Sequence, residues 1–407
     1  MEIFVAAQPV LDRACKTIAY ELLHRTNIGQ NFYDYDDEDL ATESVIVDAF
    51  NTIGIQHLTN GKPALINFSK KMLFGPLLSV LPKEQLIIEL METIVPTDDF
   101  IERCKSLKAS GYTLALDDFL YSPEYEPLVG IADIIKVDFL RLSEDEIIRI
   151  VNRFKGRARL LAEKIETMEA FDRAKEMGFT YFQGFFFSKP VIHKTADISP
   201  LKLSLLELIG VVTREEVDFN KIAEIVSRDV SLSFRLLRLI NSAYFGLPKR
   251  ITSLKHAATM LGQTELSRWV TLMSLRDIGA DRPTELLRMS MVRARFLETV
   301  AKKLPDYARQ SQELFLTGLL SLLDVLTETP FPELLADMSL HPNITNALMG
   351  RDDSPYSPFL KISVAYEKGI WDNIIEMSNV YNINPVDMMS CYLDAVKWCN
   401  SAYSGML

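Results

Sequence analysis

Cysteine is scarce in this sequence, and no long apolar run is present. The four cysteines, Cys15, Cys104, Cys391 and Cys399, show no C-x-x-C spacing, so we expect neither a zinc site nor a disulfide framework, and a reducing cytoplasm fits best. No stretch approaches the roughly 18 uninterrupted apolar residues that indicate a membrane span. The start, Met1-Glu2-Ile3-Phe4, lacks basic residues, so a secretory signal is not expected.

Positive charge is also in deficit. The 44 lysines and arginines face 55 aspartates and glutamates, which gives a formal net charge of −11. A general nucleic-acid surface is therefore not expected, because it needs clustered cations. A small anionic ligand remains compatible with this charge, since a bound divalent metal can invert the local field. The 407 residues are enough for two domains.

Short apolar runs recur in the first half of the chain, and each ends on a polar side chain. The residues that end them are Asn67, Glu89, the pair Asp117-Asp118, Lys136, Glu163 and Gln183. Their spacings are 22 (67 to 89), 28 (89 to 117), 19 (117 to 136), 27 (136 to 163) and 20 (163 to 183). Each interval has room for one strand, one helix and two loops, which is typical of a β/α barrel. Because the chemistry of such barrels sits at the carboxyl ends of the strands, we expect these side chains to converge on one rim.

The polar residues of this series have the composition of a metal site. A single acidic residue after a strand is usually a helix cap or a solvated loop residue. Hard divalent cations prefer carboxylate and amide oxygens, and six residues could supply them: Glu21, Asn67, Glu89, Asp117, Asp118 and Glu163. An aspartate pair suits two metals about 4 Å apart, an arrangement that hydrolyses phosphodiesters. Lys136 could hold a phosphate oxygen or the attacking water, and Gln183 could orient water. The pattern predicts an enzyme with an acidic metal site.

The pattern of the sequence changes near residue 190. Before it, residues 99–110 and 168–177 have helical periodicity and are followed by glycine, between strand-like runs. From about Pro200 nearly every segment has helical periodicity, including residues 201–212, 285–304, 312–327 and 385–403. Two prolines and several polar residues mark the junction. We predict an α/β barrel domain over residues 1–192, a linker over 193–200 and an all-α domain over 201–407.

The ordered motifs of the first domain resemble those of the EAL family of cyclic-di-GMP phosphodiesterases. Residues 21–25 (E-L-L-H-R) resemble the E-A-L-x-R motif, and Gln8-Pro9 resembles the glutamine–proline pair of the first strand. The other matches are N-F-S at 67–69, E-L-M-E at 89–92, D-D-F at 117–119, K-V-D at 136–138, E-K-I-E-T at 163–167 and Q-G-F at 183–185. Each motif is weak alone, whereas the ordered set over residues 1–192 is specific.

This resemblance implies a fold, a reaction and a set of roles. The fold would be a modified TIM-type (β/α)8 barrel with an antiparallel first strand, and the reaction a two-metal hydrolysis that opens cyclic-di-GMP to pGpG. Glu21, Asn67, Glu89 and Asp117 would bind one Mg²⁺ or Mn²⁺, and Asp117, Asp118 and Glu163 the second. Lys136 would touch the nucleophilic water and, with Glu21 and Glu163, form the catalytic group. Gln8, Leu23, Arg25 and Gln183 would contact the ligand or order water near it.

One loop departs from the family pattern. Active members usually continue D-D-F with G-T-G-Y-S, whereas residues 120–124 read L-Y-S-P-E, with no glycine to adopt left-handed backbone conformations. Glu92, which matches the glutamate that anchors this loop, is retained. Two alternatives therefore stay open: a catalytically inactive cyclic-di-GMP receptor or protein-interaction scaffold, and a barrel hydrolase that acts on another phosphoester. The resemblance also implies that barrels can pair through their rims as a homodimer.

The helical half resembles the HDOD domain, a relative of the HD phosphohydrolases. The resemblance rests on residues 229–243, 251–257, 261–262 and 318–324. An HD metal site needs several histidines and a His-Asp dipeptide. Only His256 and His341 lie in this half, and neither precedes aspartate. We therefore predict a non-catalytic module that contacts a protein partner not identified by the sequence. The whole chain would then be a cytoplasmic bacterial signalling protein, and the resemblance suggests control of motility and biofilm formation.

Overall fold

We describe the computed structural model of this chain for residues 3–26, 55–79, 81–91, 94–117, 123–189, 199–214, 262–336 and 340–406, and for the single residues 222, 225, 241 and 338. The chain divides into two compact units. The first comprises Met1–Lys189 together with Tyr366–Trp371, and the second comprises Pro190–Ala365 and Asp372–Leu407.

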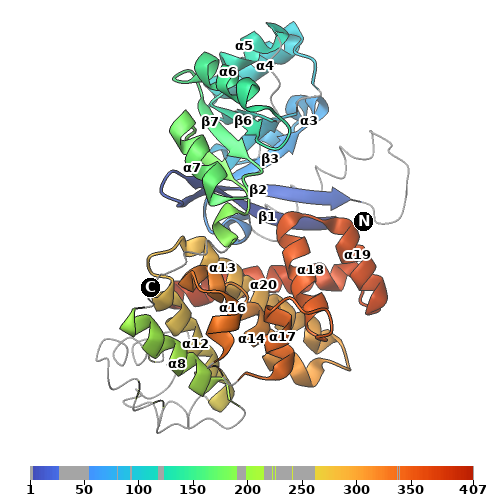
Figure 1. The fold of residues 1–407 in the computed structure, drawn as a ribbon. Helices are drawn as coiled ribbons and strands as arrows, with labels where there is room; N and C mark the ends of the chain where they lie inside the picture. The colour runs from blue at the N-terminus through green and yellow to red at the C-terminus, as the bar shows by residue number, and fades with distance from the viewer. Residues whose placement is uncertain are drawn as a thin grey trace. The chain divides into compact units, whose positions relative to one another are not determined.

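The first unit contains a closed eight-stranded barrel in the order β1 to β8 (Figure 1). The strands are β1 (Ile3–Asp12), β2 (Thr17–Thr26), β3 (Ala64–Phe68), β4 (Leu86–Leu90), β5 (Thr113–Leu116), β6 (Ile134–Asp138), β7 (Arg159–Glu163) and β8 (Tyr181–Gln183). β1 is antiparallel to both of its neighbours, β2 and β8, and all other pairings from β2 to β8 are parallel. The predicted α/β barrel with an antiparallel first strand is confirmed.

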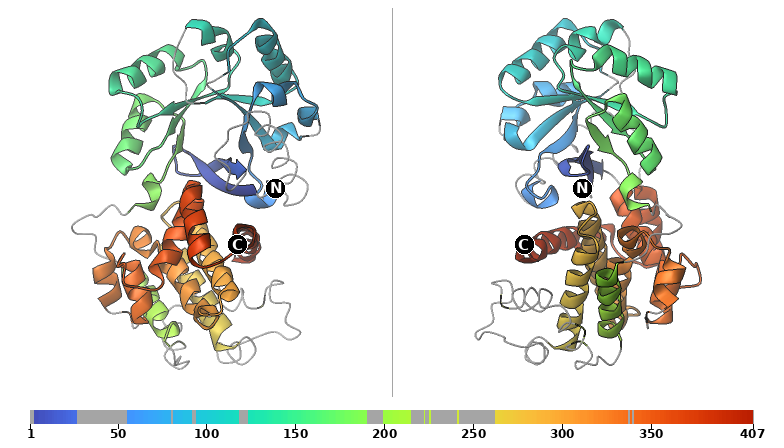
Figure 2. Two further views of the ribbon diagram at one scale, coloured as in Figure 1. Left: turned by 90° about the vertical axis from the view of Figure 1, so that its right-hand side faces the viewer. Right: turned by 60° about the vertical axis from the view of Figure 1, so that its left-hand side comes forward.

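Helices surround the barrel on its outside (Figure 2). They are α2 (Ile55–Leu58), α3 (Lys70–Phe74), α4 (Asp98–Ala109), α5 (Glu126–Val129), α6 (Glu144–Phe154) and α7 (Met168–Met177). Local sequence sets their ends. Ser143 is the N-cap residue of α6, and in its capping box the carboxylate of Glu146 accepts a hydrogen bond from the Ser143 backbone N–H at 2.8 Å. α7 begins after Thr167 and ends at Gly178, whose φ of 108° is a left-handed conformation that favours glycine.

A layer of apolar side chains fills the barrel interior and determines where the polar residues point. The layer consists of Val10, Ala19, Leu65, Ile87, Ala115, Ile134 and Leu161. Alternate residues of a strand face the same side, so residues two positions nearer the rim also face inward. Those residues are Gln8, Glu21, Asn67, Glu89, Asp117, Lys136 and Glu163. For β1 the step runs backward in sequence, because that strand is antiparallel to the others.

The second unit is helical. Its helices are α8 (Pro200–Val212), α12 (Gln263–Ile278), α13 (Thr284–Lys303), α14 (Ser311–Leu320), α15 (Leu323–Thr327), α16 (Phe331–Ala336), α17 (Pro342–Leu348), α18 (Ser357–Lys368), α19 (Trp371–Val380) and α20 (Pro385–Met406). The ends of α18 and α19 fall in the segment that belongs to the first unit. α13 packs against α14, and Gly318 permits close approach because a Cβ there would lie 2.6 Å from the Ala294 backbone nitrogen.

Of two helices predicted in the helical half, one is present and the other is divided in two. The predicted helix over residues 285–304 is present as α13, whereas the single helix predicted over 312–327 is wrong, since α14 ends at Leu320 and α15 begins at Leu323. The Ser321 hydroxyl donates a hydrogen bond to the Gly318 carbonyl at 2.7 Å, and such a side-chain bond competes with the helical ladder. The resemblance to HDOD over residues 229–257 falls outside the described residues except for residue 241.

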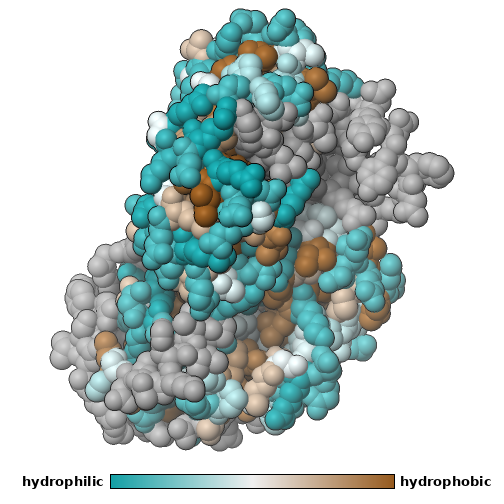
Figure 3. Space-filling model, turned by 45° about the horizontal axis from the view of Figure 1, so that its top comes forward, coloured by the Kyte–Doolittle hydropathy of each residue, from teal (hydrophilic) through white to brown (hydrophobic). Residues whose placement is uncertain are grey.

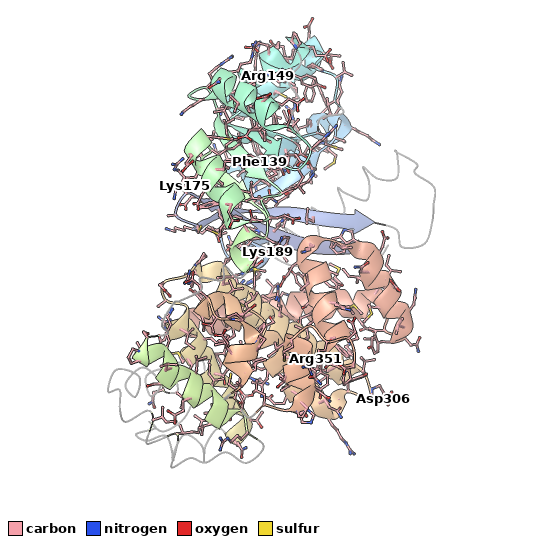
Figure 4. All side chains as sticks on the ribbon, viewed as in Figure 1. Phe139, Arg149, Lys175, Lys189, Asp306 and Arg351 are labelled. Atoms are coloured by element: carbon pink, nitrogen blue, oxygen red, sulfur yellow. The ribbon has the colours of Figure 1, made fainter. Side chains whose placement is uncertain are left out.

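Surface character agrees with a water-exposed exterior for the barrel. Hydrophilic residues dominate the barrel face drawn in Figure 3, with hydrophobic residues scattered among them. Figure 4 shows the side chains, with Arg149 on α6 and Lys175 on α7 among those labelled. Within the described ranges, no helix combines the length and the apolar character that crossing a membrane would require.

Candidate active site

The inward-facing polar residues gather at one end of the barrel. Glu21, Glu89, Lys136, Glu163 and Gln183 are buried, and they lie on β2, β4, β6, β7 and β8. Asp117 directly follows β5, and its backbone N–H donates to the Leu90 carbonyl at 3.0 Å. The sequence-based prediction that these residues converge on one rim therefore holds for them.

Lys136 stands at the centre of this group. Its side chain is 1% exposed, and its Nζ lies 2.9 Å from Asp117 Oδ1, 2.9 Å from Glu163 Oε1 and 3.3 Å from Glu21 Oε1. Glu89, which is fully buried, forms a fourth ion pair with the same ammonium. One cation thus faces four carboxylates in a place removed from water. Because buried charges are stable only when they are paired, this cluster has an excess of negative charge that calls for further cations or protons.

The crowding of carboxylates changes their protonation. Burial, and then the nearby charges of Glu21 and Asp117, raise the pKa of Glu163 to about 8, although the Lys136 ammonium opposes the shift. Burial likewise raises the pKa of Glu89 well above its ordinary value. For Lys136, burial alone would lower the pKa, but the four surrounding carboxylates outweigh it and raise that pKa. A carboxyl group with a pKa near neutrality can accept and release protons at working pH.

Two glutamines complete the rim on the side of β1 and β8. The Gln183 Nε2 donates to Gln8 Oε1 at 3.0 Å and also to Glu21 Oε2. Leu23 follows Glu21 on the same inward side of β2, pairs with Ala6 on β1 and is half-buried. Three of the predicted site features cannot be placed in this way: Asp118, Glu92 and the side chain of Arg25 lie outside the described residues, as do residues 120–122 of the unusual loop.

The donor set fits a hard divalent cation. At the rim, four buried oxygens have no hydrogen-bond partner among the described residues: Asn67 Oδ1, Glu89 Oε2, Glu163 Oε2 and Gln183 Oε1. Carboxylate and amide oxygens are the ligands that Mg²⁺, Mn²⁺ and Ca²⁺ prefer. Among the described residues, however, no three His, Cys, Asp or Glu side chains are arranged to hold a metal ion. The carboxylates instead converge on the Lys136 ammonium, so metal binding would require them to turn from it.

One supporting residue, the aspartate of the K-V-D motif, was given no role in the sequence analysis. Asp138 is buried, accepts hydrogen bonds from the backbone N–H groups of Leu140 and Arg141 at 2.7 and 3.0 Å, and pairs with Lys164 at 2.5 Å. Lys164 has a left-handed φ of 56°, so this contact holds the chain directly after Glu163. The available signal was the alternation of the strand, because Asp138 follows Lys136 by two positions.

The fold and the site together define a class of protein, and two family models identify it. A closed barrel with one antiparallel strand and an acidic rim precedes a helical unit; the EAL domain model matches residues 56–190, and the HDOD domain model matches residues 198–334. The chain belongs to the family of proteins that join an EAL domain to an HDOD domain.

Two relatives span nearly the whole chain. The uncharacterized protein YuxH of Bacillus subtilis (strain 168) is 34% identical over 410 residues, which cover 98% of this chain and 99% of YuxH. The cyclic di-GMP phosphodiesterase CdgJ of Vibrio cholerae serotype O1 is 34% identical over 398 residues, or 97% of this chain and 92% of CdgJ. Among solved structures, a cyclic-di-GMP-bound standalone EAL protein of Vibrio cholerae O395 is 22% identical and covers 49% of this chain and 96% of its own, with a TM-score of 0.39.

Proposed function

We propose that this protein hydrolyses cyclic-di-GMP to linear pGpG at the acidic rim of the barrel. The observation that carries the proposal is the buried ammonium of Lys136 among four carboxylates, on a barrel whose 34% identical full-length relative CdgJ is named a cyclic di-GMP phosphodiesterase. The family membership supports the substrate, and the rim residues support the reaction.

The chain's own residues divide the work at the rim. Glu21, Asn67, Glu89 and Asp117 would hold one Mg²⁺ or Mn²⁺, and Asp117, Asp118 and Glu163 a second. When bound, the metals would supply electrostatic stabilisation of the phosphodiester and activation of water. Lys136 would place its ammonium beside the attacking water. Glu163 would act either as that metal ligand or as a proton acceptor, while Gln183 and Gln8 would orient the ligand and nearby water.

The proposal includes the organisation of the chain. The catalytic barrel would extend over residues 1–192 and join through residues 193–200 to a non-catalytic domain over 201–407 that contacts a protein partner. The scarcity of histidine in that second part supports its lack of hydrolytic chemistry. All four cysteines are free thiols, which supports a location in a reducing cytoplasm.

The test is to incubate the full-length protein with cyclic-di-GMP and Mn²⁺ or Mg²⁺, to separate the products by chromatography and to measure ligand binding in parallel. Glu21→Gln removes a proposed metal ligand, and we expect the rate to fall at least ~100-fold, since even residues behind the ligands cost 10–100-fold. Glu102→Gln is the matched control, because Glu102 lies on α4 with its side chain 70% exposed.

Three outcomes separate the readings. Formation of pGpG that is lost in Glu21→Gln and retained in Glu102→Gln establishes the phosphodiesterase. Tight binding without turnover makes the barrel a cyclic-di-GMP receptor, the reading favoured by the missing glycines of residues 120–124. Absence of both binding and turnover refutes the proposal and leaves a protein-interaction scaffold or a hydrolase of another phosphoester.

A further inference from the structure

A concave site lies at the opposite end of the barrel from the acidic rim. It has a volume of about 440 Å³, and its lining includes Asp133, Lys155, Gly156, Arg157, Arg159 and Gly178. Arg159 begins β7 and Glu163 ends it. Four steps along a strand span about 13 Å at roughly 3.3 Å each, so this basal pocket is separate from the rim.

The lining of the basal pocket is basic, although the chain carries a net charge of −11. Of the charged residues that line it, Lys155, Arg157 and Arg159 are cationic and Asp133 is the acidic one. This carboxylate is already engaged, because it pairs with Lys108 and accepts a hydrogen bond from the Leu114 backbone N–H at 3.0 Å. It is therefore not available to neutralise the three cations.

The partners of the arginines leave positive charge in excess. Arg157 pairs with Glu126 at 2.9 Å, but Glu126 also pairs with Arg153 at 3.1 Å. Arg159 donates to the Tyr181 hydroxyl at 2.9 Å, and its guanidinium lies 5.8 Å from the centre of the Tyr181 ring. These contacts orient Arg159 without supplying a negative charge.

Lys155 is the third source of positive charge. Across the described residues no ion pair of Lys155 is found, and its ammonium lies against the turn at Gly178, where a Cβ would come within 3.1 Å of Nζ. Gly178 has a φ of 108°, and Gly156 has a φ of 86°. A Cβ on Gly156 would meet nothing within 4 Å. The two glycines therefore leave room around the ammonium.

We propose that the basal pocket binds a small phosphate anion of high charge, namely diphosphate, either free or as part of a nucleotide. Guanidinium groups match the oxygens of a phosphate in a planar, bidentate geometry, and an ammonium adds a point charge. The volume falls within the range of small-molecule sites. This site involves none of the residues that form the acidic rim, so it stands independently of the proposed hydrolysis.

The test uses the full-length protein in EDTA at low salt, with inorganic pyrophosphate titrated by calorimetry. EDTA keeps divalent cations from attracting the anion to the acidic rim. Lys155→Glu reverses one charge of the pocket, and we expect it to weaken binding at least tenfold. Lys105→Glu makes the same change on α4, where Lys105 pairs with Glu102 at 2.6 Å outside the pocket, and we expect binding to remain unchanged.

Further measurements decide the remaining outcomes. Arg159→Gln provides a second pocket variant should Lys155→Glu fail to give a folded protein by circular dichroism, and the same loss is expected. GDP titrated in parallel distinguishes the sources: tenfold tighter binding than pyrophosphate indicates a nucleotide, and equal binding indicates recognition of the diphosphate alone. Three results would overturn the proposal. They are an equal loss of pyrophosphate binding in Lys155→Glu and Lys105→Glu, undiminished binding by both pocket variants, and no binding by the unaltered protein.

Discussion

Replacing Lys136 by methionine removes a cation that pairs with Glu21, Glu89, Asp117 and Glu163 and keeps most of the side-chain volume. Because the raised pKa of Glu163, about 8, already favours its protonated form at pH 7, loss of the ammonium requires at least one further carboxylate to take up a proton and restore the local charge. Protonating a glutamate of ordinary pKa near 4.3 at pH 7 costs about 1.36 kcal/mol for each of about 2.7 pH units, or roughly 3.7 kcal/mol. This value lies within the range of about 3–5 kcal/mol measured when one partner of a buried ion pair is removed.

The same reasoning gives a pH dependence. The folded variant would hold one proton that its unfolded chain releases, so its stability should decrease as pH rises. At pH 5 the cost of protonation is only about 1 kcal/mol, since the pH is within about 0.7 units of the ordinary pKa. The loss of stability relative to the unaltered protein should therefore shrink from roughly 3.7 to about 1 kcal/mol between pH 7 and pH 5.

Hydrogen exchange of the full-length protein in EDTA is the suitable assay, because peptides from β4, β6 and β7 report the opening of the barrel separately from the helical unit. Lys105→Met is the matched control, since Lys105 forms an exposed ion pair with Glu102 and such pairs contribute little. Added Mn²⁺ should protect Lys136→Met more than the unaltered protein, because the metal replaces the missing charge. A loss of stability that is the same at pH 5 and pH 7, or no loss at pH 7, would refute the reasoning.

Other changes test single features of each unit. In EDTA the barrel should lose stability as pH rises from about 4.5 to about 8. Folding raises the pKa of Glu163 across this interval, so the folded state keeps a proton that the unfolded chain has lost. Thermal unfolding at several pH values checks this, and Glu163→Gln should reduce the dependence of stability on pH. Glu298→Ala should destabilise the helical unit by about 3–5 kcal/mol, since this buried carboxylate pairs with Arg268, Arg295 and Lys302 at 2.9, 2.8 and 2.6 Å. An unchanged rate of amide hydrogen exchange in α13 would contradict this expectation. Gly184→Ala should destabilise the barrel by about 3 kcal/mol or more, because a Cβ would lie 2.6 Å from the Ile165 backbone nitrogen. Gly156→Ala is the control: a Cβ there has open space around it, so the change should cost only about 1 kcal/mol of backbone strain.

The sequence by itself determined which residues reach the rim. The spacing of the apolar runs indicated the strands, and alternation along each strand required that Asn67, Glu89 and Lys136 share a face with the buried residues two positions earlier. Those are local properties, set by backbone geometry within a few residues. The same reasoning found α13 from its periodicity, and it failed at Ser321, where a hydroxyl bond to a neighbouring carbonyl ends α14.

Only the tertiary structure decided which of these groups touch. Gln183 reaches Glu21 across 162 residues of sequence, and Lys136 reaches Glu21 across 115. No local pattern encodes those pairs, because they depend on how the barrel closes. Closure also buries the carboxylates, and burial is the leading cause of the raised pKa of Glu163. The basal pocket has the same origin. Lys155 follows α6, Arg159 begins β7 and Gly178 follows α7, and these residues converge only once β7 and β8 are paired.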